Sequence, residues 1–180
     1  MRMSSDVALQ DHDQSTLVVP VPAAEPAVAM WRNRHDPAAR AGIPAHVTIL
    51  IPFLPPHTIT AGEEERLAHL FASFKAFRFH LRDVRRFPGA LYLAPEPADR
   101  FVQLTSAVWS AWPMCPPYGG RFADIVPHLT VADHVGDDVL DTVERAIAAA
   151  VPIEAYASEL SLMVQQQGRW RVRRTFALGA

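Results

Sequence analysis

Two copies of the pattern His-x-Thr, each followed by an aliphatic residue, constrain this chain more than any other feature of its sequence. The first copy reads Pro44-Ala45-His46-Val47-Thr48-Ile49, and the second reads Val126-Pro127-His128-Leu129-Thr130-Val131. In an extended strand, side chains two positions apart point to the same face and lie about 6.6–6.8 Å apart. Histidine and threonine therefore share one face of each predicted strand. One such pattern can occur by chance, whereas two copies with matching flanks indicate a duplicated element.

The predicted elements around the two copies follow one order, which is strand, helix, His-x-Thr strand, helix, strand. In the first unit we expect strands at residues 15–22, 44–51 and 77–82 and helices at 23–35 and 60–74. In the second unit we expect strands at 91–94, 126–132 and 153–164, helices at 95–112 and 137–150, and a final strand at 170–178. This order predicts a duplication, with a first repeat at about residues 16–86 and a second repeat at about 90–178.

Local signals support the two helices that follow the His-x-Thr strands. Thr60 and Glu63 have the spacing of a capping box. Asp137 or Asp138 can cap the corresponding helix of the second unit. The buried face of the first of these helices is predicted from apolar residues at helical spacing, which are Leu67, Leu70, Phe71 and Phe74.

The chain is therefore expected to fold as one bilobal α+β domain at residues 15–180, preceded by a disordered tail at residues 1–14. Hydrophobic residues make up 49% of the chain and charged residues 20%, as in ordinary folded globular proteins. We expect each repeat to form a small antiparallel sheet backed by helices. Pseudo-twofold packing of the repeats would then bring both His-x-Thr faces to one central cleft.

Charge and cysteine content narrow the classes of partner and compartment. The net charge of -2 argues against binding along extended nucleic acid, which usually demands a basic face, but it permits a small nucleotide or a strand end. Two arginine clusters fit either solvated faces or a phosphate-contacting patch, and they comprise Arg82, Arg85 and Arg86, and Arg169, Arg171, Arg173 and Arg174. Cys115 is the single cysteine, and no segment resembles a secretory signal or a membrane span. We expect a cytoplasmic protein with no membrane association and no obligate protein partner.

Two imidazoles that converge on one cleft suit concerted acid–base catalysis. Because the ordinary pKa of histidine is about 6.5, one ring can be neutral while the other is protonated near neutral pH. A threonine hydroxyl two residues along can donate a hydrogen bond to a charged oxygen at the same point. Phosphodiester chemistry, with its nucleophile and leaving group on opposite sides of phosphorus, fits this set best. A zinc site is the alternative, but no third ligand has metal-binding spacing, and neither HExxH nor CxxC occurs. We therefore expect no metal and no cofactor.

The two motifs resemble the paired H-x-T/S motifs of the two-histidine (2H) phosphoesterase superfamily. From about Ser15 onward the chain is similar in particular to bacterial proteins of the 2'-5' RNA ligase family. The resemblance implies a bilobal α+β fold with antiparallel sheets along a water-filled cleft. It also implies metal-independent cleavage or formation of a bond at a 2',3'-cyclic phosphate or a 2'-5' phosphodiester. His46 and His128 would be the acid–base pair, in an order left open, and Thr48 and Thr130 would hold the nonbridging phosphoryl oxygens.

Three functions are compatible with this resemblance. They are hydrolysis of 2',3'-cyclic phosphates on RNA ends or small nucleotides, 2'-5' RNA ligation in the reverse direction, and noncatalytic binding of RNA or a nucleotide in the same cleft. Outside the motifs, Tyr118 can stack on a base or contact phosphate, or it can pack within its proline- and glycine-rich loop. Arg171 and Arg173 alternate on the last strand and can face either the cleft or solvent.

Overall fold

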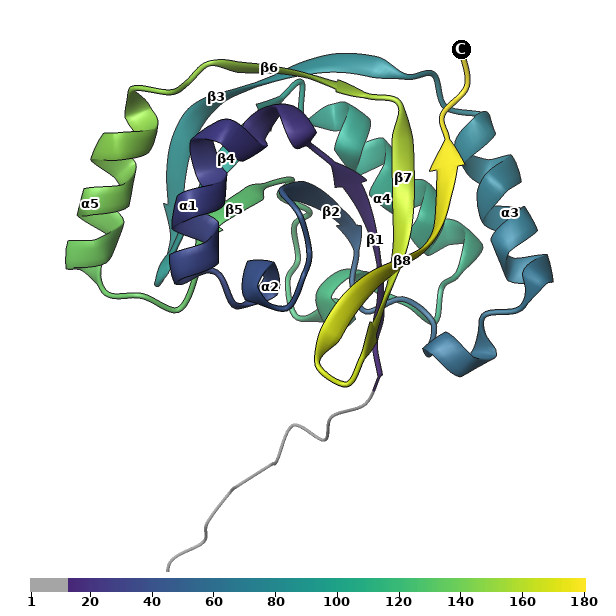
Figure 1. Cartoon of the computed structure of the whole chain (residues 1–180). Coiled ribbons are helices and arrows are strands. Elements are labelled where there is room, and N and C mark those ends of the chain that lie inside the picture. The colour runs from purple at the N-terminus through teal and green to yellow at the C-terminus, as the bar shows by residue number, and fades with distance from the viewer. Residues whose placement is uncertain (1–12) are drawn as a thin grey trace, which may run out of the picture.

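A computed structural model describes residues 13–180, so the predicted tail at residues 1–14 lies almost wholly outside the described residues. Within that range the chain forms eight strands, five α-helices and three short 3-10 helices (Figure 1). The strands are β1 (Ser15–Pro20), β2 (His46–Leu50), β3 (Phe77–Phe87), β4 (Ala90–Glu96), β5 (Leu129–Ala132), β6 (Ile153–Ala157), β7 (Glu159–Gln166) and β8 (Arg169–Ala177). The helices are α1 (Glu25–His35), α2 (Pro37–Arg40), α3 (Ala61–Ala72), α4 (Asp99–Ala111) and α5 (Asp137–Ala148), with 3-10 helices η1 (Pro22–Ala24), η2 (Pro56–Thr58) and η3 (Pro117–Gly120).

The strands form two four-stranded antiparallel sheets with equivalent strand orders. One sheet has the order β2-β1-β7-β8, and the other has the order β5-β4-β3-β6. Each sheet therefore has a motif-bearing strand at one edge, next to the strand that opens the same repeat. The predicted α+β fold with two antiparallel sheets is confirmed.

The two repeats are interlocked, so the expectation that each repeat forms a sheet of its own is wrong. β3, from the first repeat, pairs with β4, and β7, from the second repeat, pairs with β1. The single strand predicted at residues 153–164 breaks at Ser158 into β6 and β7, which belong to different sheets. In Figure 1 the chain bends at this point from β6 into β7. Each sheet is thus completed by strands from both repeats.

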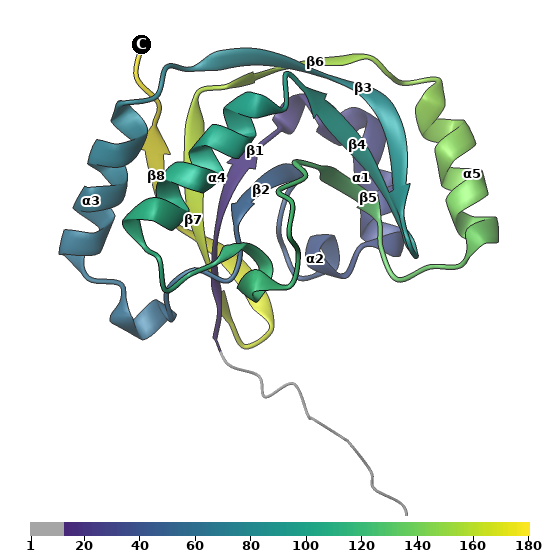
Figure 2. The same ribbon diagram turned by 180° about the vertical axis from the view of Figure 1, so that it is seen from behind.

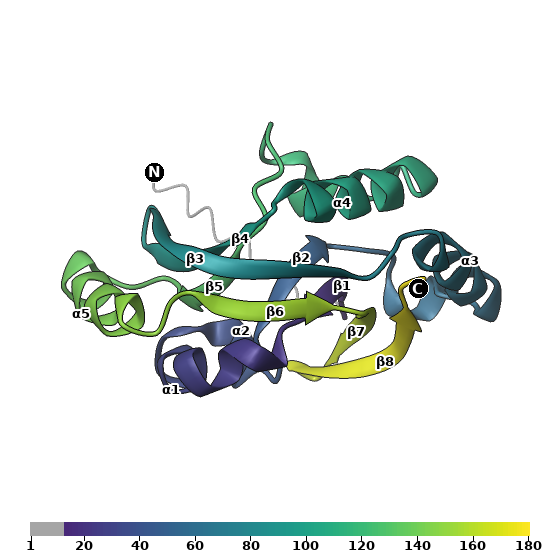
Figure 3. The ribbon, with the colours of Figure 1, turned by 90° about the horizontal axis from the view of Figure 1, so that it is seen from above.

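The helix that connects the first two strands of each repeat packs against a strand of the other repeat. α1 packs against β5, and α4 packs against β2. α1 lies in front of the strands in Figure 1, whereas α4 lies in front of them in the reverse view of Figure 2, and Figure 3 shows α3 and α5 at opposite ends. Thr105 of α4 fixes one of these contacts, because its hydroxyl donates to the Ile49 carbonyl at 2.8 Å. Each motif-bearing strand is therefore positioned by a helix of the other repeat.

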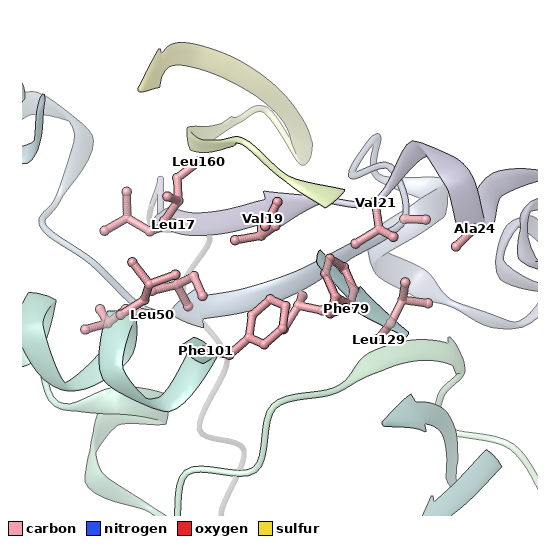
Figure 4. Packing of buried hydrophobic residues seen from close by; sticks show 14 of the residues in the cluster. Leu17, Val19, Val21, Ala24, Leu50, Phe79, Phe101, Leu129 and Leu160 are labelled. Carbon is pink, nitrogen blue, oxygen red and sulfur yellow. The ribbon is translucent and has the colours of Figure 1, made fainter. Parts of the chain in front are cut away.

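One hydrophobic core joins the two sheets and the helices between them. Its buried residues come from both repeats, and Figure 4 shows Phe79 and Phe101 among side chains of β1, β2 and β5. The rings of Phe79 and Phe101 meet edge to face with centroids 5.0 Å apart, a favoured geometry for aromatic pairs. Because this core is continuous, it holds the two motif-bearing strands in fixed positions relative to each other.

Two helix starts differ from the predicted ones. α4 begins at Asp99 rather than at Pro95, because Pro95 still pairs with β3 at the end of β4. The N-cap of α5 is Gly136, and neither Asp137 nor Asp138 caps the helix with its side chain. Both aspartates lie in the first turn, where negative charge is stabilised by the helix dipole.

α3 starts as predicted and is capped by Thr60, but the Glu63 carboxylate of the predicted capping box binds other side chains. The Thr60 hydroxyl accepts a hydrogen bond from the Glu63 backbone N–H at 3.2 Å. The Glu63 carboxylate accepts from Trp112 Nε1 at 2.7 Å and from Arg66 at 3.0 Å. Glu63 thus links α3 to the end of α4.

Candidate active site

The structure brings the two His-x-Thr motifs together, one from each sheet. β2 and β5 contact each other, although they lie in different sheets. In β2 the half-buried His46 and Thr48 alternate with the buried Val47 and Ile49. The second motif has the same alternation, with His128 immediately before β5. The polar face predicted for each strand is therefore turned out of the core toward the other motif.

Both imidazole rings are held by the same local contact. Nδ1 of His46 lies 2.7 Å from the Pro44 carbonyl oxygen, and Nδ1 of His128 lies 2.7 Å from the Val126 carbonyl oxygen. A carbonyl oxygen only accepts hydrogen bonds, so Nδ1 carries the proton and donates it in each case. In the neutral ring, Nε2 then holds the free lone pair. Nε2 is therefore the atom of each ring that can accept or deliver a proton at the site.

The surroundings of both histidines favour the neutral ring, more strongly at His46. Burial and the nearby charge of Arg32 lower the pKa of His46 to about 4, against opposing effects of the Pro44 carbonyl and Asp36. Burial also lowers the pKa of His128, whereas the Val126 carbonyl and Asp133 raise it. The charge of His128 lowers the pKa of His46 as well, as expected for two rings at one site. The two motifs are thus alike in geometry but differ in their charged neighbours.

The Arg32 charge near His46 belongs to a buried ion pair that the sequence did not predict. Nη2 and Nε of Arg32 lie 2.9 and 3.1 Å from Asp36 Oδ2, and the two side chains are 2% and 3% exposed. Nη2 also donates to the Ile43 carbonyl at 3.3 Å, and Asp36 Oδ1 accepts from the Ala38 N–H at 2.9 Å. The pair therefore anchors α1 to the segment that enters β2. Its helical i, i+4 spacing is the one sequence signal that could have revealed it.

Tyr118 lies between the two motifs. Its backbone N–H donates to the Ile51 carbonyl at the end of β2, at 2.6 Å. Its ring lies within 20° of parallel to the His128 ring, with centroids 6.2 Å apart. Burial raises the pKa of Tyr118 to about 12, and a hydrogen bond with the Thr48 side chain acts in the opposite direction. Tyr118 therefore combines contacts within its loop with contacts to both motifs.

A pocket of about 600 Å³ opens beside His128. Tyr118 and Phe122 form part of its wall, and Asp124 and Asp133 contribute carboxylates. All of the residues that define it lie between positions 87 and 133, and they are Phe87, Pro88, Ala90, Tyr118, Phe122, Ala123, Asp124, Val126, His128 and Asp133. The pocket is therefore built by the β3–β4 turn and the segment from Tyr118 to Asp133, on the His128 side of the site.

The aromatic residues around His128 were not predicted as site residues. Phe87 and Tyr92 stack on each other with centroids 4.2 Å apart, and both meet the His128 ring edge-on, at 5.2 and 5.5 Å. Tyr92 pairs with Thr130 in the register of β4 and β5. Phe87 and Tyr92 lie beside His128 because of this strand pairing, and no local sequence pattern predicts the pairing.

Arg86 and Arg173, one from each arginine cluster, bind acidic residues of the helices α5 and α3. Arg173 donates to Glu64 of α3 at 2.7 Å and to the Pro56 and Ile59 carbonyls, so it does not face the cleft. Arg86 pairs with Asp141 and Glu144 of α5. Arg171 is exposed on β8, at the sheet edge opposite β2.

Two further features are absent from residues 13–180. No helix in this range is long and apolar enough to cross a membrane. Nor do three His, Cys, Asp or Glu side chains gather there in a way that could hold a metal ion.

Comparison with known proteins identifies a family and a fold. The family model described as the 2'-5' RNA ligase superfamily matches residues 19–169. E. coli LigT complexed with 3'-AMP superposes with a TM-score of 0.58 at 20% identity, over 94% of this chain and 100% of LigT. TT0787 of Thermus thermophilus gives 0.60 at 17% identity over 92% and 97%, and a phosphoesterase gives 0.57 at 20% over 93% and 99%. No curated protein sequence matches the chain.

Proposed function

This chain belongs to the 2'-5' RNA ligase superfamily of 2H phosphoesterases, and on that premise we propose that it hydrolyses 2',3'-cyclic phosphates at RNA ends or on small nucleotides. The observation that carries the proposal is that the imidazoles of His46 and His128 are held by the same backbone contact on two strands that touch. Their strands are in contact, and the carbonyl two residues before each ring holds Nδ1 and leaves Nε2 for proton transfer. Two such rings supply the base and the acid that phosphodiester hydrolysis needs.

In the proposed reaction the two motifs act on opposite sides of one phosphate. One histidine takes a proton from water as the water oxygen attacks phosphorus, and the other gives a proton to the departing ribose oxygen. The hydroxyls of Thr48 and Thr130 donate to the nonbridging oxygens as negative charge develops there. No metal ion takes part in these steps.

The pocket beside His128 supports a nucleoside as the organic part of the substrate. Its volume of about 600 Å³ lies within the usual range for small-molecule sites. Phe87, Tyr118 and Phe122 offer aromatic faces, and stacking of a base on such a face is typically worth about 1–3 kcal/mol. LigT, which shares the fold, has been crystallised with 3'-AMP, NADP+ and ATP.

The direct test is turnover of the four 2',3'-cyclic nucleotides in the presence of EDTA, followed by phosphorus NMR. We expect conversion to a single phosphomonoester, unaffected by the chelator. RNA halves ending in a cyclic phosphate and a 5'-hydroxyl would be tested in parallel, because the same acid–base pair can run the reverse, 2'-5' joining reaction. Binding of nucleotides with no turnover of any cyclic phosphate and no joining would contradict the proposal.

We expect kcat/KM to depend on pH as a bell whose maximum lies on the acid side of pH 6.5. The pKa of His46 is lowered to about 4, and that of His128 is also lowered. Catalysis needs one ring neutral and the other protonated, a state most populated between the two pKa values. Activity therefore falls below about pH 4, where both rings are protonated, and again above the pKa of His128, where both are neutral. Initial rates at substrate concentrations well below KM check this, and a maximum on the alkaline side of neutrality would contradict it.

Removing the Tyr118 hydroxyl is expected to lower kcat/KM by about 3- to 10-fold. The hydroxyl interacts with Thr48, and one hydrogen bond is typically worth about 0.5–1.5 kcal/mol, where about 1.4 kcal/mol is tenfold. Tyr118→Phe keeps the ring beside His128, whereas Tyr118→Ala also removes a wall of the pocket and is expected to raise KM. Tyr156→Phe, at an exposed tyrosine of β6, is the matched control. If both Tyr118 variants had wild-type kinetics, Tyr118 would serve only to pack its loop.

A further inference from the structure

One peptide unit, between Pro44 and Ala45, connects helix α1 to the ring of His46. Its carbonyl oxygen lies 2.7 Å from Nδ1 of His46 and accepts a hydrogen bond from it. Its N–H, which belongs to Ala45, donates to the Glu25 carboxylate at 2.6 Å. The peptide is planar and trans, so its N–H and C=O groups point in opposite directions. A partner that fixes the direction of the N–H therefore also fixes the direction of the carbonyl that holds His46.

Burial makes the contact with Glu25 necessary. Ala45 is 1% exposed, and its own carbonyl already accepts from the Val21 N–H at 2.8 Å. A buried N–H without a partner is costly, which is why nearly all such groups in folded proteins are paired. Glu25 lies in the first turn of α1, directly after the 3-10 helix that follows β1, and from there its carboxylate reaches the Ala45 N–H. Without this carboxylate the peptide would have to turn to find another acceptor, and the Pro44 carbonyl would turn with it.

The second motif fixes the corresponding carbonyl by a different means. Nδ1 of His128 lies 2.7 Å from the Val126 carbonyl, and the peptide that contains this carbonyl ends at Pro127. Proline has no N–H, and its ring fixes φ near −65°. This peptide therefore has no donor that needs a partner, and it has less freedom to turn. The same ring contact is obtained with a proline in the second motif and with a carboxylate in the first.

We propose that Glu25 is a positioning residue for His46. Its carboxylate holds the Ala45 N–H and thereby directs the Pro44 carbonyl, which keeps the proton of the neutral ring on Nδ1. Nε2 of His46 then has its lone pair free for proton transfer. The consequence for catalysis rests on the proposed function, to which this inference adds a residue that acts through the peptide rather than on the substrate.

The tautomer of His46 can be measured without any assay of activity. On the alkaline side of neutrality both rings are neutral, and ¹⁵N spectra of the imidazoles distinguish the nitrogen that bears the proton from the one that does not. We expect the wild type to carry the proton on Nδ1 in both His46 and His128. In Glu25→Ala we expect a mixture of the two tautomers at His46 and no change at His128. An unchanged His46 in this variant would overturn the proposal, whatever the activity of the protein.

Two further variants separate the hydrogen bond from other effects of Glu25. Glu25→Ala/Ala45→Pro gives the first motif the proline of the second, so it removes the N–H donor together with its acceptor. Glu25→Gln keeps a side-chain oxygen that can accept from the Ala45 N–H. We expect both variants to carry the proton of His46 on Nδ1, as the wild type does. If neither restored this tautomer, altered packing of α1 would be the cause, and the proposal would be wrong.

Steady-state kinetics with a 2',3'-cyclic nucleotide give a second readout. We expect Glu25→Ala to lower kcat by about 5- to 100-fold, the factor that corresponds to leaving a buried N–H unpaired, with little change in KM. Glu25→Gln and the double variant are expected to recover most of this loss. Asp99→Ala removes a first-turn carboxylate from α4, the corresponding helix of the second repeat, and is the matched control, with kcat expected to be unchanged.

The two readouts distinguish failure of this inference from failure of the proposed function. Wild-type kcat in Glu25→Ala, measured beside an active wild type, would overturn the role of Glu25 and leave the proposed function standing. Absence of turnover by the wild type would refute the proposed function, and the tautomer of His46 would still decide whether Glu25 positions this ring.

Discussion

Replacing His46 or His128 with alanine is expected to lower kcat/KM for a 2',3'-cyclic nucleotide by about 10²- to 10⁴-fold in each case. Each substitution removes one Nε2 and leaves the hydroxyls of Thr48 and Thr130 in place. Both rings are only half-buried, outside the core that joins the two sheets, so the variants are expected to remain folded. Steady-state kinetics, with circular dichroism and thermal melting as checks of folding, measure the effect.

His69 provides a matched control for these substitutions. Its Nδ1 also lies close to a backbone carbonyl, that of Glu65 at 2.8 Å, but the ring is exposed on α3. His69→Ala removes the same type of contact far from the motifs and is expected to leave kcat/KM unchanged. His46→Asn and His128→Asn separate position from chemistry, because an amide can donate to the carbonyl that held Nδ1 but cannot relay a proton.

The double variant His46→Ala/His128→Ala tests whether the rings act as a unit. Groups that act in one step are strongly non-additive, so the double variant is expected to lose little more than the worse single variant. Wild-type activity in either single variant would show that its histidine takes no part in proton transfer. That result would favour noncatalytic binding, or a different pair of groups, in the same cleft.

The polar face of each motif was predictable because it depends only on the two-residue period of a strand. His46 and Thr48 lie on one face and Val47 and Ile49 on the other, as the sequence indicates. The helix at Glu25–His35 and the cap at Thr60 were predictable for the same reason, since a few neighbouring residues determine them. The matching second motif then allowed the prediction that the two faces meet.

The pairing of strands was not predictable, because it is set by contacts between distant segments. The run from Ile153 to Val164 is predicted as one strand, yet Ser158 divides it between the two sheets. No turn residue marks this change, since the backbone stays extended on both sides. The exchange of β3 and β7 between the sheets follows from the same tertiary contacts.

The pocket and the ion pair were missed for a related reason. Phe87 lies between the strands predicted at residues 77–82 and 91–94, and Tyr92 lies in the second of them. They meet His128 only because β4 pairs with both β3 and β5. Asp36 directly follows the helix predicted at residues 23–35, and it is the C-cap of α1. Its burial with Arg32 depends on the segment that folds over it. Charged residues in an alanine-rich helix are usually solvated, so burial was the less expected outcome.

Breaking the Arg32–Asp36 pair is expected to lower the free energy of unfolding by about 3–5 kcal/mol. In Arg32→Met the Asp36 carboxylate loses both guanidinium contacts and keeps only the Ala38 N–H, while it stays out of water. For a chain of this size, the loss corresponds to a fall of roughly 6–20 °C in Tm. The same substitution removes a positive charge that opposes protonation of His46, so the pKa of His46 rises and the acid limb of kcat/KM moves to higher pH. Urea unfolding and the pH profile of the folded fraction measure the two effects.

The cost of Arg32→Met is attributed here to an uncompensated buried charge, and two further variants test that cause. Asp83→Ala breaks the Asp83–Arg85 pair, in which both side chains are 57% exposed, and is expected to cost about 0–1 kcal/mol. Arg32→Met/Asp36→Asn removes both charges but keeps an acceptor for the Ala38 N–H, so it is expected to recover much of the stability lost in Arg32→Met. If the double variant were as unstable as Arg32→Met, lost packing would be the cause. If Arg32→Met cost no more than Asp83→Ala, the pair would not anchor α1 to the strand that carries His46.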